Sequence, residues 1–262
     1  MAELEKPQSV AGKIAFSPRS PIRTVPPDEI KQLLTAHRRY VETVRREGRR
    51  ANLGSADLSG MDFSGFNLRR VKMDRALLKG TDFTQAQLQR ANLVGAVLEQ
   101  ARLDRADLTG ARLSGANLVS ASLENCNLAQ ADMEFALMVK AVLSGASLQG
   151  ADISGAILDG AVLNRADLRR ANLRGAGFRD AQLDEADLRE ARLGGAFLVG
   201  ASLRGADLRG AYLRSATFDG ADLSGANLFG AEGLTRLQLD QALRIVGATL
   251  PAEFTGAEDV KP

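Results

Sequence analysis

One apolar position recurs at a fixed interval through most of the chain. From Leu53 to Leu228, every fifth residue is Leu, Ile, Met or Phe, over 36 consecutive units without a gap. The residue two places earlier is Ala in 31 of the 36 units, and the exceptions are Met61, Phe66, Val71, Thr81 and Cys126. A period of five fits neither an α-helix, with about 3.6 residues per turn, nor a flat strand, whose side chains alternate. The pattern therefore predicts a repeat architecture.

Each unit offers one large apolar residue, one small residue, and three positions that are mostly polar or Gly. Asp, Asn, Ser and Gly within the units disfavour a helix. A chain that points two of every five residues inward must coil around its own axis, so that large and small side chains alternate around a narrow core. Gly at the last unit position, as at Gly60, Gly110 and Gly160, permits the sharp turn between sides.

The units at 56–60, Ala-Asp-Leu-Ser-Gly, and at 91–95, Ala-Asn-Leu-Val-Gly, resemble the A(D/N)LxG units of the pentapeptide-repeat family. The resemblance covers residues 51–230 and implies an all-β solenoid, a right-handed quadrilateral β-helix with four units per coil. Residues 51–232 would then form about nine coils, and a strand spacing of about 4.8 Å gives a rod roughly 43 Å long.

Both ends of such a stack are exposed strand edges, which need covers. We expect short α-helical caps at both ends. Residues 28–50 predict a basic amphipathic helix over the first coil, since Pro residues precede it, acidic residues begin it and Gly48 follows it. Its apolar face comprises Ile30, Leu33, Leu34, His37, Val41 and Val44.

The other end predicts a second helix over residues 233–248, N-capped by Thr235. Its apolar residues exceed one stripe, so it serves as a cap or as a dimer contact, and some family members dimerise through such an end. The residues concerned are Leu237, Leu239, Leu243 and Ile245. Residues 1–27 hold five of the seven prolines and predict a disordered arm, and 249–262 predict a flexible tail.

Candidate chemistry is sparse. The chain has one His, His37, and one Cys, Cys126, so neither metal-site spacing nor a Cys–His pair is present. Because Leu and Ala fill the core, no pocket with converging groups is expected. We therefore predict a protein that is not an enzyme, with no cofactor and no small-molecule substrate. The absence of a long apolar run and of a secretory pattern favours a cytoplasmic protein. The segment 234–251 resembles the C-terminal tails of bacterial pentapeptide-repeat proteins, which implies a bacterial source.

Residues 20 apart should stack on neighbouring coils, which turns the sequence into a surface map. One side places apolar residues where family units usually carry polar ones, and a contiguous apolar stripe marks a contact surface. We call this stripe the apolar ladder; it comprises Leu77, Val97, Leu137, Ile157 and Phe197, with Val119, Val139 and Val199. It predicts a partner or self-association surface, unless the N-terminal arm or a flanking helix covers it.

A second side places acidic residues before the core position and basic residues after it. This charged ladder comprises Asp167, Asp187 and Asp207, with Arg169, Arg189 and Arg209. Like charges on neighbouring coils repel, so each Arg row needs the adjacent Asp row. We predict a solvated lattice of ion pairs; the alternative is a docking patch for an acidic partner.

These features favour a non-catalytic scaffold that presents a rigid rod to an unidentified protein partner, with a homodimer possible. The first alternative is a DNA-mimicking modulator or protector of DNA gyrase, the fluoroquinolone-resistance type known in this family. Residues 51–230 carry a net charge of only −1, which disfavours mimicry of a polyanion. The second alternative is binding of nucleic acid or an anionic membrane through the basic N-terminal helix, because residues 1–50 carry a net +5.

Overall fold

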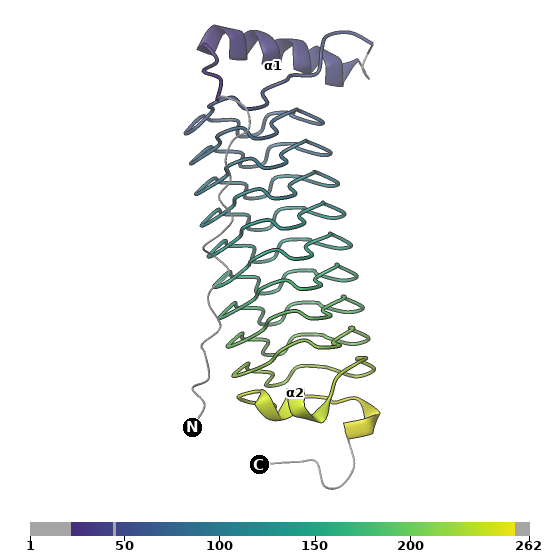
Figure 1. The fold of residues 1–262 in the computed structure, drawn as a ribbon. Helices are drawn as coiled ribbons and strands as arrows, with labels where there is room; N and C mark the ends of the chain where they lie inside the picture. The colour runs from purple at the N-terminus through teal and green to yellow at the C-terminus, as the bar shows by residue number, and fades with distance from the viewer. Residues whose placement is uncertain (1–21, 44–45, 255–262) are drawn as a thin grey trace, which may run out of the picture.

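The computed structural model describes residues 22–43 and 46–254, which form one elongated rod of stacked coils (Figure 1). Helix α1, Pro27–Glu42, lies across one end of the stack, and helix α2, Arg236–Gln241, lies at the other. The short 3-10 helix η2, Ala252–Phe254, follows α2 at the same end. The helices thus cover the two opposite ends of the rod (Figure 1).

Parallel single-residue bridges join each coil to the next with an offset of 20 residues, from Asn52↔Lys72 to Tyr212↔Glu232. Around one bridge, Leu78 N–H donates to the Val97 carbonyl at 2.7 Å and Val97 N–H donates to the Ala76 carbonyl at 2.9 Å. The same pattern repeats along the rod, so each coil satisfies the backbone groups of its neighbours. Stability then comes mainly from contacts between adjacent repeats.

The last position of each unit turns the chain from one side of the coil to the next. Ala101 N–H donates to the Leu98 carbonyl at 3.0 Å across such a turn, and Gln100 within it has a φ of 57°. Gly residues hold the same left-handed conformation, as at Gly155 with a φ of 63°. The predicted role of Gly is confirmed, although many units use a larger residue there.

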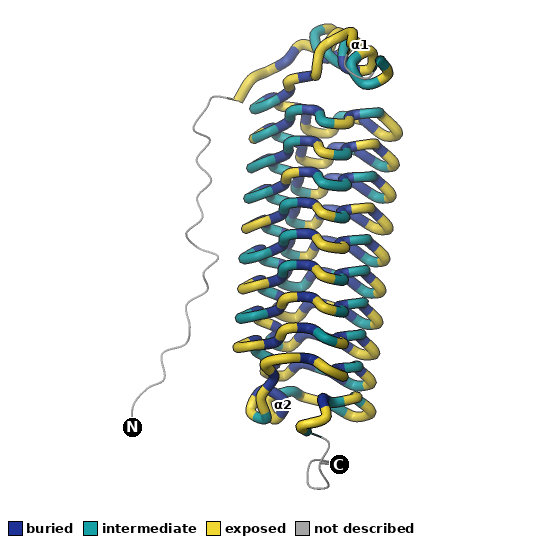
Figure 2. Tube along the Cα trace, turned by 90° about the vertical axis from the view of Figure 1, so that its right-hand side faces the viewer, coloured by how far each residue is buried: buried dark blue, intermediate teal, exposed yellow. Residues whose placement is uncertain are grey.

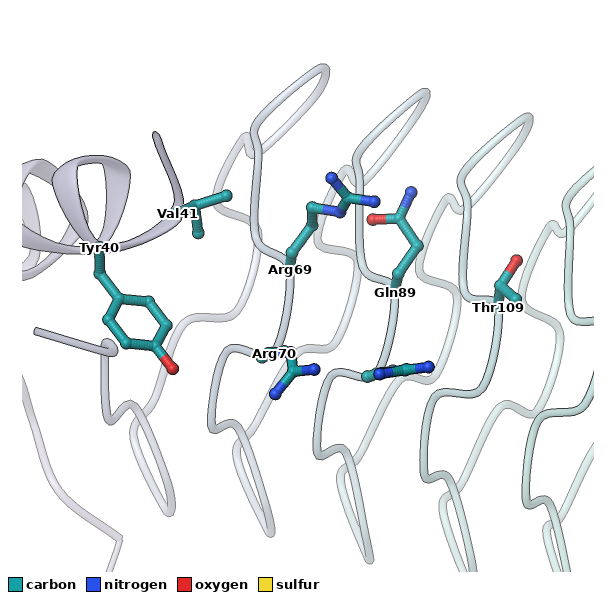
Figure 3. Close-up of a pocket in the computed structure, with 7 residues that line it drawn as sticks. Tyr40, Val41, Arg69, Arg70, Gln89 and Thr109 are labelled. Atoms are coloured by element: carbon teal, nitrogen blue, oxygen red, sulfur yellow. The ribbon is translucent and has the colours of Figure 1, made fainter. Parts of the chain in front are cut away.

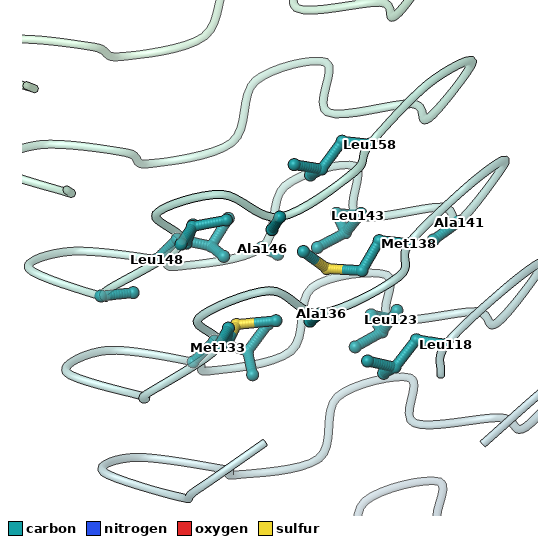
Figure 4. Close-up of a cluster of buried hydrophobic side chains, with 14 of the residues drawn as sticks. Leu118, Leu123, Met133, Ala136, Met138, Ala141, Leu143, Ala146, Leu148 and Leu158 are labelled. Atoms are coloured by element: carbon teal, nitrogen blue, oxygen red, sulfur yellow. The ribbon is translucent and has the colours of Figure 1, made fainter. Parts of the chain in front are cut away.

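The core is a column of large apolar side chains separated by Ala (Figure 4). All 36 residues of the five-residue series are buried, so this inward row runs unbroken along the rod (Figure 2). In the row of small residues, Phe66 takes the place of Ala and is 39% exposed. The Phe63 ring, stacked on Phe83 with centroids 5.4 Å apart, fills the core there, and Phe66 packs edge-on against it.

The N-terminal cap differs from the prediction at both of its bounds. Arg23 bridges to Ala56 and Val25 is buried, so residues 22–26 belong to the cap and not to a disordered arm. Helix α1 ends at Glu42, before Gly48. A Cβ on Gly48 would lie 2.2 Å from the Ala36 carbonyl oxygen, because the chain after the helix turns back against it. Residues 1–21 of the predicted arm, and Val44 of the predicted apolar face, lie outside the residues that the structure describes.

The helix of the C-terminal cap is shorter than predicted, with six residues in α2. Thr235 caps α2 in a capping box with Gln238, as expected for its side chain. The predicted helix over 233–248 is wrong beyond Gln241, since Arg244 bridges to Asp222 and Thr249 to Asn227. Ile245 and Leu250 stand five residues apart, with Gly247 in a left-handed turn between them. The five-residue pattern therefore resumes after α2. Residues 249–254, predicted as part of a flexible tail, belong to the cap, and residues 255–262 lie outside the described residues.

Candidate interaction surfaces

The structure stacks the residues of the apolar ladder on one side of the rod. Leu77 bridges to Val97, Leu137 bridges to Ile157, and Phe197 lies two coils beyond Ile157. Phe197 is 53% exposed, whereas the other members, including Val119, Val139 and Val199, are half-buried. Neighbouring coils shield the aliphatic side chains, so the aromatic ring is the member with the largest free surface.

Two residues interrupt the apolar ladder. Asn117 stands between Val97 and Leu137 and donates from Nδ2 to Glu99 Oε1 at 2.7 Å. Gly177 stands between Ile157 and Phe197, and its position is crowded by Asp159 Oδ1, 3.1 Å from where a Cβ would lie. The apolar ladder thus consists of the pair Leu77 and Val97, the pair Leu137 and Ile157, and Phe197, with Asn117 and Gly177 between them.

One exposed aromatic residue escaped the sequence analysis. Phe135 occupies a turn position two residues before Leu137, has a φ of 55° and is 63% exposed. Its ring lies over Gly155, where a Cβ would come within 2.6 Å of Phe135 Cε1. The signal in the sequence is an aromatic residue at a turn position with Gly 20 residues later, where any side chain would collide with the ring.

The charged ladder is brought together as predicted, in a zigzag along the rod. Arg169 Nη2 lies 2.6 Å from Asp167 Oδ2, and Arg169 Nε lies 3.5 Å from Asp187 Oδ2 on the next coil. Arg189 repeats both contacts with Asp187 and Asp207, and Arg209 ends the series on Asp207. Each inner carboxylate therefore bridges two guanidinium groups.

These ion pairs shift the titration of the carboxyl groups. The hydrogen bond from the Arg169 side chain lowers the pKa of Asp167 and outweighs the opposing effect of burial. At Asp207 burial alone would raise the pKa, but hydrogen bonds from the Arg209 side chain and backbone lower it overall. The lowered pKa of Asp167 and of Asp207 favours the ionised form that these ion pairs require.

The residues predicted as a cap or dimer contact divide into two groups. Leu239 is buried and Ile245 packs against the core, so both belong to the cap. Leu237 is 67% exposed and Leu243 is 65% exposed. Val246, at 72%, joins them on the outside of the C-terminal end. Only the second group is free for a partner.

Gln238 is a structural residue that the sequence analysis missed. It is buried, its Oε1 accepts a hydrogen bond from Thr235 N–H at 2.7 Å, and its Nε2 donates to the carbonyls of Leu213 and Ala216. One amide therefore caps the helix and closes the carbonyl edge of the last full coil. The signal was the Thr-x-x-Gln capping box itself.

The single His and Cys are both buried. His37 accepts a hydrogen bond at Nδ1 from Ala51 N–H at 3.2 Å, and its ring stacks on Tyr40 with centroids 5.9 Å apart. Burial, helped by repulsion from Arg50, lowers the pKa of His37. Burial raises the pKa of the Cys126 thiol. Both side chains therefore serve the packing of the rod and its cap.

The part of the chain that the structure describes has neither a metal site nor a membrane-spanning helix. No group of three or more His, Cys, Asp or Glu side chains there is placed to hold a metal ion. None of the helices found there has the length and apolar content needed to cross a bilayer.

The geometry defines a class, a solenoid whose 20-residue coils stack on backbone hydrogen bonds around a Leu and Ala core. The family model for pentapeptide repeats matches eight copies between residues 49 and 242. The chain belongs to the pentapeptide repeat family. Proteins of this family form right-handed quadrilateral β-helices and are generally non-enzymatic structural or interaction proteins.

Solved structures of the same family resemble the chain. HetL, a pentapeptide repeat protein of the cyanobacterium Nostoc involved in the regulation of heterocyst differentiation, is 30% identical over 81% of this chain and 90% of its own, with a TM-score of 0.40. QnrB1, a plasmid-mediated fluoroquinolone resistance protein, is 21% identical over 75% of this chain and 92% of its own, with a TM-score of 0.39. The search of curated proteins gave no match.

Proposed function

We propose that the protein is a non-catalytic interaction protein of the cytoplasm, whose rod presents the apolar ladder to a protein partner. The observation that carries the proposal is the row of apolar side chains at positions that point out of the coil. Phe197 and Phe135 keep more than half of their surface exposed at either end of the pair Leu137 and Ile157. Exposed aromatic side chains flanked by aliphatic ones are typical anchors of protein interfaces.

The test is a pair of variants that differ only in the side they change. Ile157→Asp/Phe197→Asp places two carboxylates on the apolar ladder, and Ser147→Asp/Gln182→Asp places two on other sides of the rod. We expect the first variant to lose self-association in light scattering, or binding to the partner once purified, while circular dichroism stays unchanged. Equal binding by the two variants would exclude the apolar ladder as the interface.

The C-terminal end offers a second route to self-association. Leu237, Leu243 and Val246 expose most of their surface beyond the last coil. A dimer that persists in Ile157→Asp/Phe197→Asp and dissociates in Leu243→Asp would assign the dimer contact to this end. The apolar ladder would then remain free for a different partner.

Modulation of DNA gyrase is the alternative function, suggested by the description of QnrB1 as a fluoroquinolone resistance protein. The charge pattern weighs against it, because Asp167, Asp187 and Asp207 are neutralised by the arginines of the charged ladder. A duplex mimic needs an unbroken anionic strip. Supercoiling by gyrase, measured with and without an excess of the protein, decides the question; a change in activity or in fluoroquinolone sensitivity would favour the alternative.

Binding of nucleic acid or an anionic membrane through α1 is the second alternative. Arg38 and Arg39 are exposed on this helix. Deletion of the helix would also remove the cap, since Ile30 and His37 are buried. Arg38→Gln/Arg39→Gln is the cleaner test, and binding to duplex DNA or anionic vesicles that this variant abolishes, with strong salt dependence, would support the alternative.

A further inference from the structure

A cavity of about 470 Å³ lies where the C-terminal half of α1 meets the first coils (Figure 3). Tyr40 and Val41 come from the helix. The rod contributes two rows, which run parallel to its axis from one coil to the next. The lining residues of the rod are Arg69, Arg70, Gln89, Arg90 and Thr109. The cavity therefore has an aromatic and aliphatic wall on one side and three guanidinium groups on the other.

The register of the repeat places these arginines. Arg69 follows the core residue Leu68, and Arg70 and Arg90 occupy the same turn position on neighbouring coils, 20 residues apart. Side chains at this turn position lean along the rod axis, as shown by Arg90 Cγ, 3.6 Å from where a Cβ on Gly110 would lie. Arg70 and Arg90 are therefore stacked like charges about one strand spacing of ~4.8 Å apart.

At the other end of the same side of the rod, the equivalent arginines are paired with carboxylates. Arg170 occupies the turn position there and pairs with Glu190 of the next coil, Nε to Oε2 at 2.8 Å. Arg169 pairs with Asp167, whereas the equivalent residue before Arg69 is Asn67. Among the residues that the structure describes, none forms a recorded ion pair with Arg69, Arg70 or Arg90. Within that part of the chain, Arg70 and Arg90 thus have no paired carboxylate, and the nearest negative charge that acts on Arg69 is that of Asp107.

A carboxylate on this side of the rod is already occupied by hydrogen bonds. Asp107 accepts hydrogen bonds from Gln89 Nε2 at 2.5 Å, from Thr109 N–H at 3.0 Å and from the Thr109 hydroxyl at 2.6 Å. Arg69 lies close enough to attract it, but no hydrogen bond joins them. Gln89 is held by Asp107 so that its Oε1 is buried and has no hydrogen-bond partner. This oxygen is closed off in the wall of the cavity, so the polar groups left for a ligand are the guanidinium groups.

We propose that this cavity binds a small phosphorylated ligand. The phosphate lies between Arg70 and Arg90 with Arg69 beside it, because guanidinium forks match the oxygens of a phosphate in pairs. Tyr40 and Val41 cover the organic part of the ligand. The volume falls within the ~300–1,000 Å³ typical of small-molecule sites. This ligand is separate from any protein partner of the apolar ladder.

Isothermal titration calorimetry of the full chain with phenyl phosphate and with inorganic phosphate, at about 0.15 M salt, tests the proposal. We expect saturable binding at one site. Arg70→Gln/Arg90→Gln should weaken the affinity by about tenfold or more, since it removes both forks from the phosphate. The matched control Arg112→Gln/Arg192→Gln removes two exposed arginines from another side and should leave binding unchanged.

A second variant keeps the proposal falsifiable if the first loses its fold. Arg90→Glu gives Arg70 the partner that Glu190 gives Arg170, so the fold should persist while phosphate binding is lost. No heat with the wild-type protein would overturn the proposal. So would an equal loss in the control variant, or binding to anionic vesicles or duplex DNA without binding to either small phosphate.

Discussion

The two ends of one side of the rod carry arginines in equivalent places and use them differently. Near the C-terminal end, Arg169 and Arg170 each meet a carboxylate on their own or the next coil. Near the N-terminal end, Arg70 meets Arg90 at the same spacing. Backbone hydrogen bonds and the buried core are the same at both ends. The comparison shows that the repeat fixes where a side chain points, and the residue 20 positions on decides whether it is paired.

The two caps close the ends of the rod with different elements and different side chains. At the N-terminal end, α1 covers the first coil with an apolar face, and His37 accepts one backbone N–H. At the C-terminal end, α2 has only six residues, and the amide of Gln238 binds two exposed carbonyls. Both strand edges present donors and acceptors: Asp57 N–H donates to the Arg23 carbonyl at one end, and Leu223 N–H donates to the Arg244 carbonyl at the other. The caps therefore differ in the side chain that completes each one, and not in the kind of backbone group that needs a partner.

The largest effect should come from the core that both ends share. Ala91→Leu near the N-terminal end and Ala171→Leu near the C-terminal end should each destabilise the rod by about 1–3 kcal/mol or more, because both positions are fully buried beside a large residue. Chemical denaturation measures the loss. Ser154→Leu, at an outward position, is the control and should be nearly neutral. Unequal costs for the two Ala variants would show that the ends differ inside as well as outside.

The C-terminal cap should depend on one amide. Gln238→Ala leaves the carbonyls of Leu213 and Ala216 without their side-chain donor, and we expect a loss of about 1–3 kcal/mol. Hydrogen exchange should locate the loss in the last coils. Leu237→Ala, in the same helix but exposed, is the matched control, and a comparable effect there would mean that the helix and not the amide closes the end.

The N-terminal cap should weaken at mildly acidic pH. The pKa of His37 is lowered by burial in the folded protein, whereas the unfolded chain keeps a pKa near the ordinary value of 6.5. As the pH falls below 6.5, only the unfolded state takes up the proton, so the free energy of unfolding decreases until the pH passes the lowered pKa. Hydrogen exchange in α1 between pH 7 and pH 5 reports the change.

The control for this prediction is His37→Gln, whose amide can still accept from Ala51 N–H but does not titrate in this range. A variant that keeps the same pH dependence would assign it to another group. Asp167 of the charged ladder should not contribute over this interval. Its pKa lies below the ordinary value of 3.8, so its stabilising effect is lost only as the pH falls from about that value through the lowered pKa.

The smallest effect should come from giving Arg70 a carboxylate partner on the next coil, like the one that Glu190 provides for Arg170. Arg90→Glu should raise the melting temperature slightly at low salt, because a like-charge contact with Arg70 becomes an attractive one. Arg90→Gln, which only removes the repulsion, should raise it less. The difference between the two should shrink at high salt, and a melting temperature unaffected by either variant would show that solvent already screens Arg70 from Arg90.

Much of the fold could be predicted because a single register runs through it. Leu53 to Leu228 keep one period, and the charged ladder follows from counting 20 residues along the chain. The prediction failed where that register broke. Six residues of α2 interrupt the repeat, so Ile245 was assigned to a helix and Leu250 to a flexible tail, although both resume the coil. The apolar ladder was placed correctly in space, and its function remains a prediction.

By itself the sequence determined the repeat, its inward rows and which residues stack, because a short period leaves one way to bury Leu and Ala together. Only the tertiary structure decided what lies beside the rod. The cavity between Tyr40 and Arg70 depends on where α1 crosses the first coil, and the role of Gln238 depends on which carbonyls the last coil leaves open. Those contacts join residues outside the period to residues within it, and no spacing along the chain encodes them.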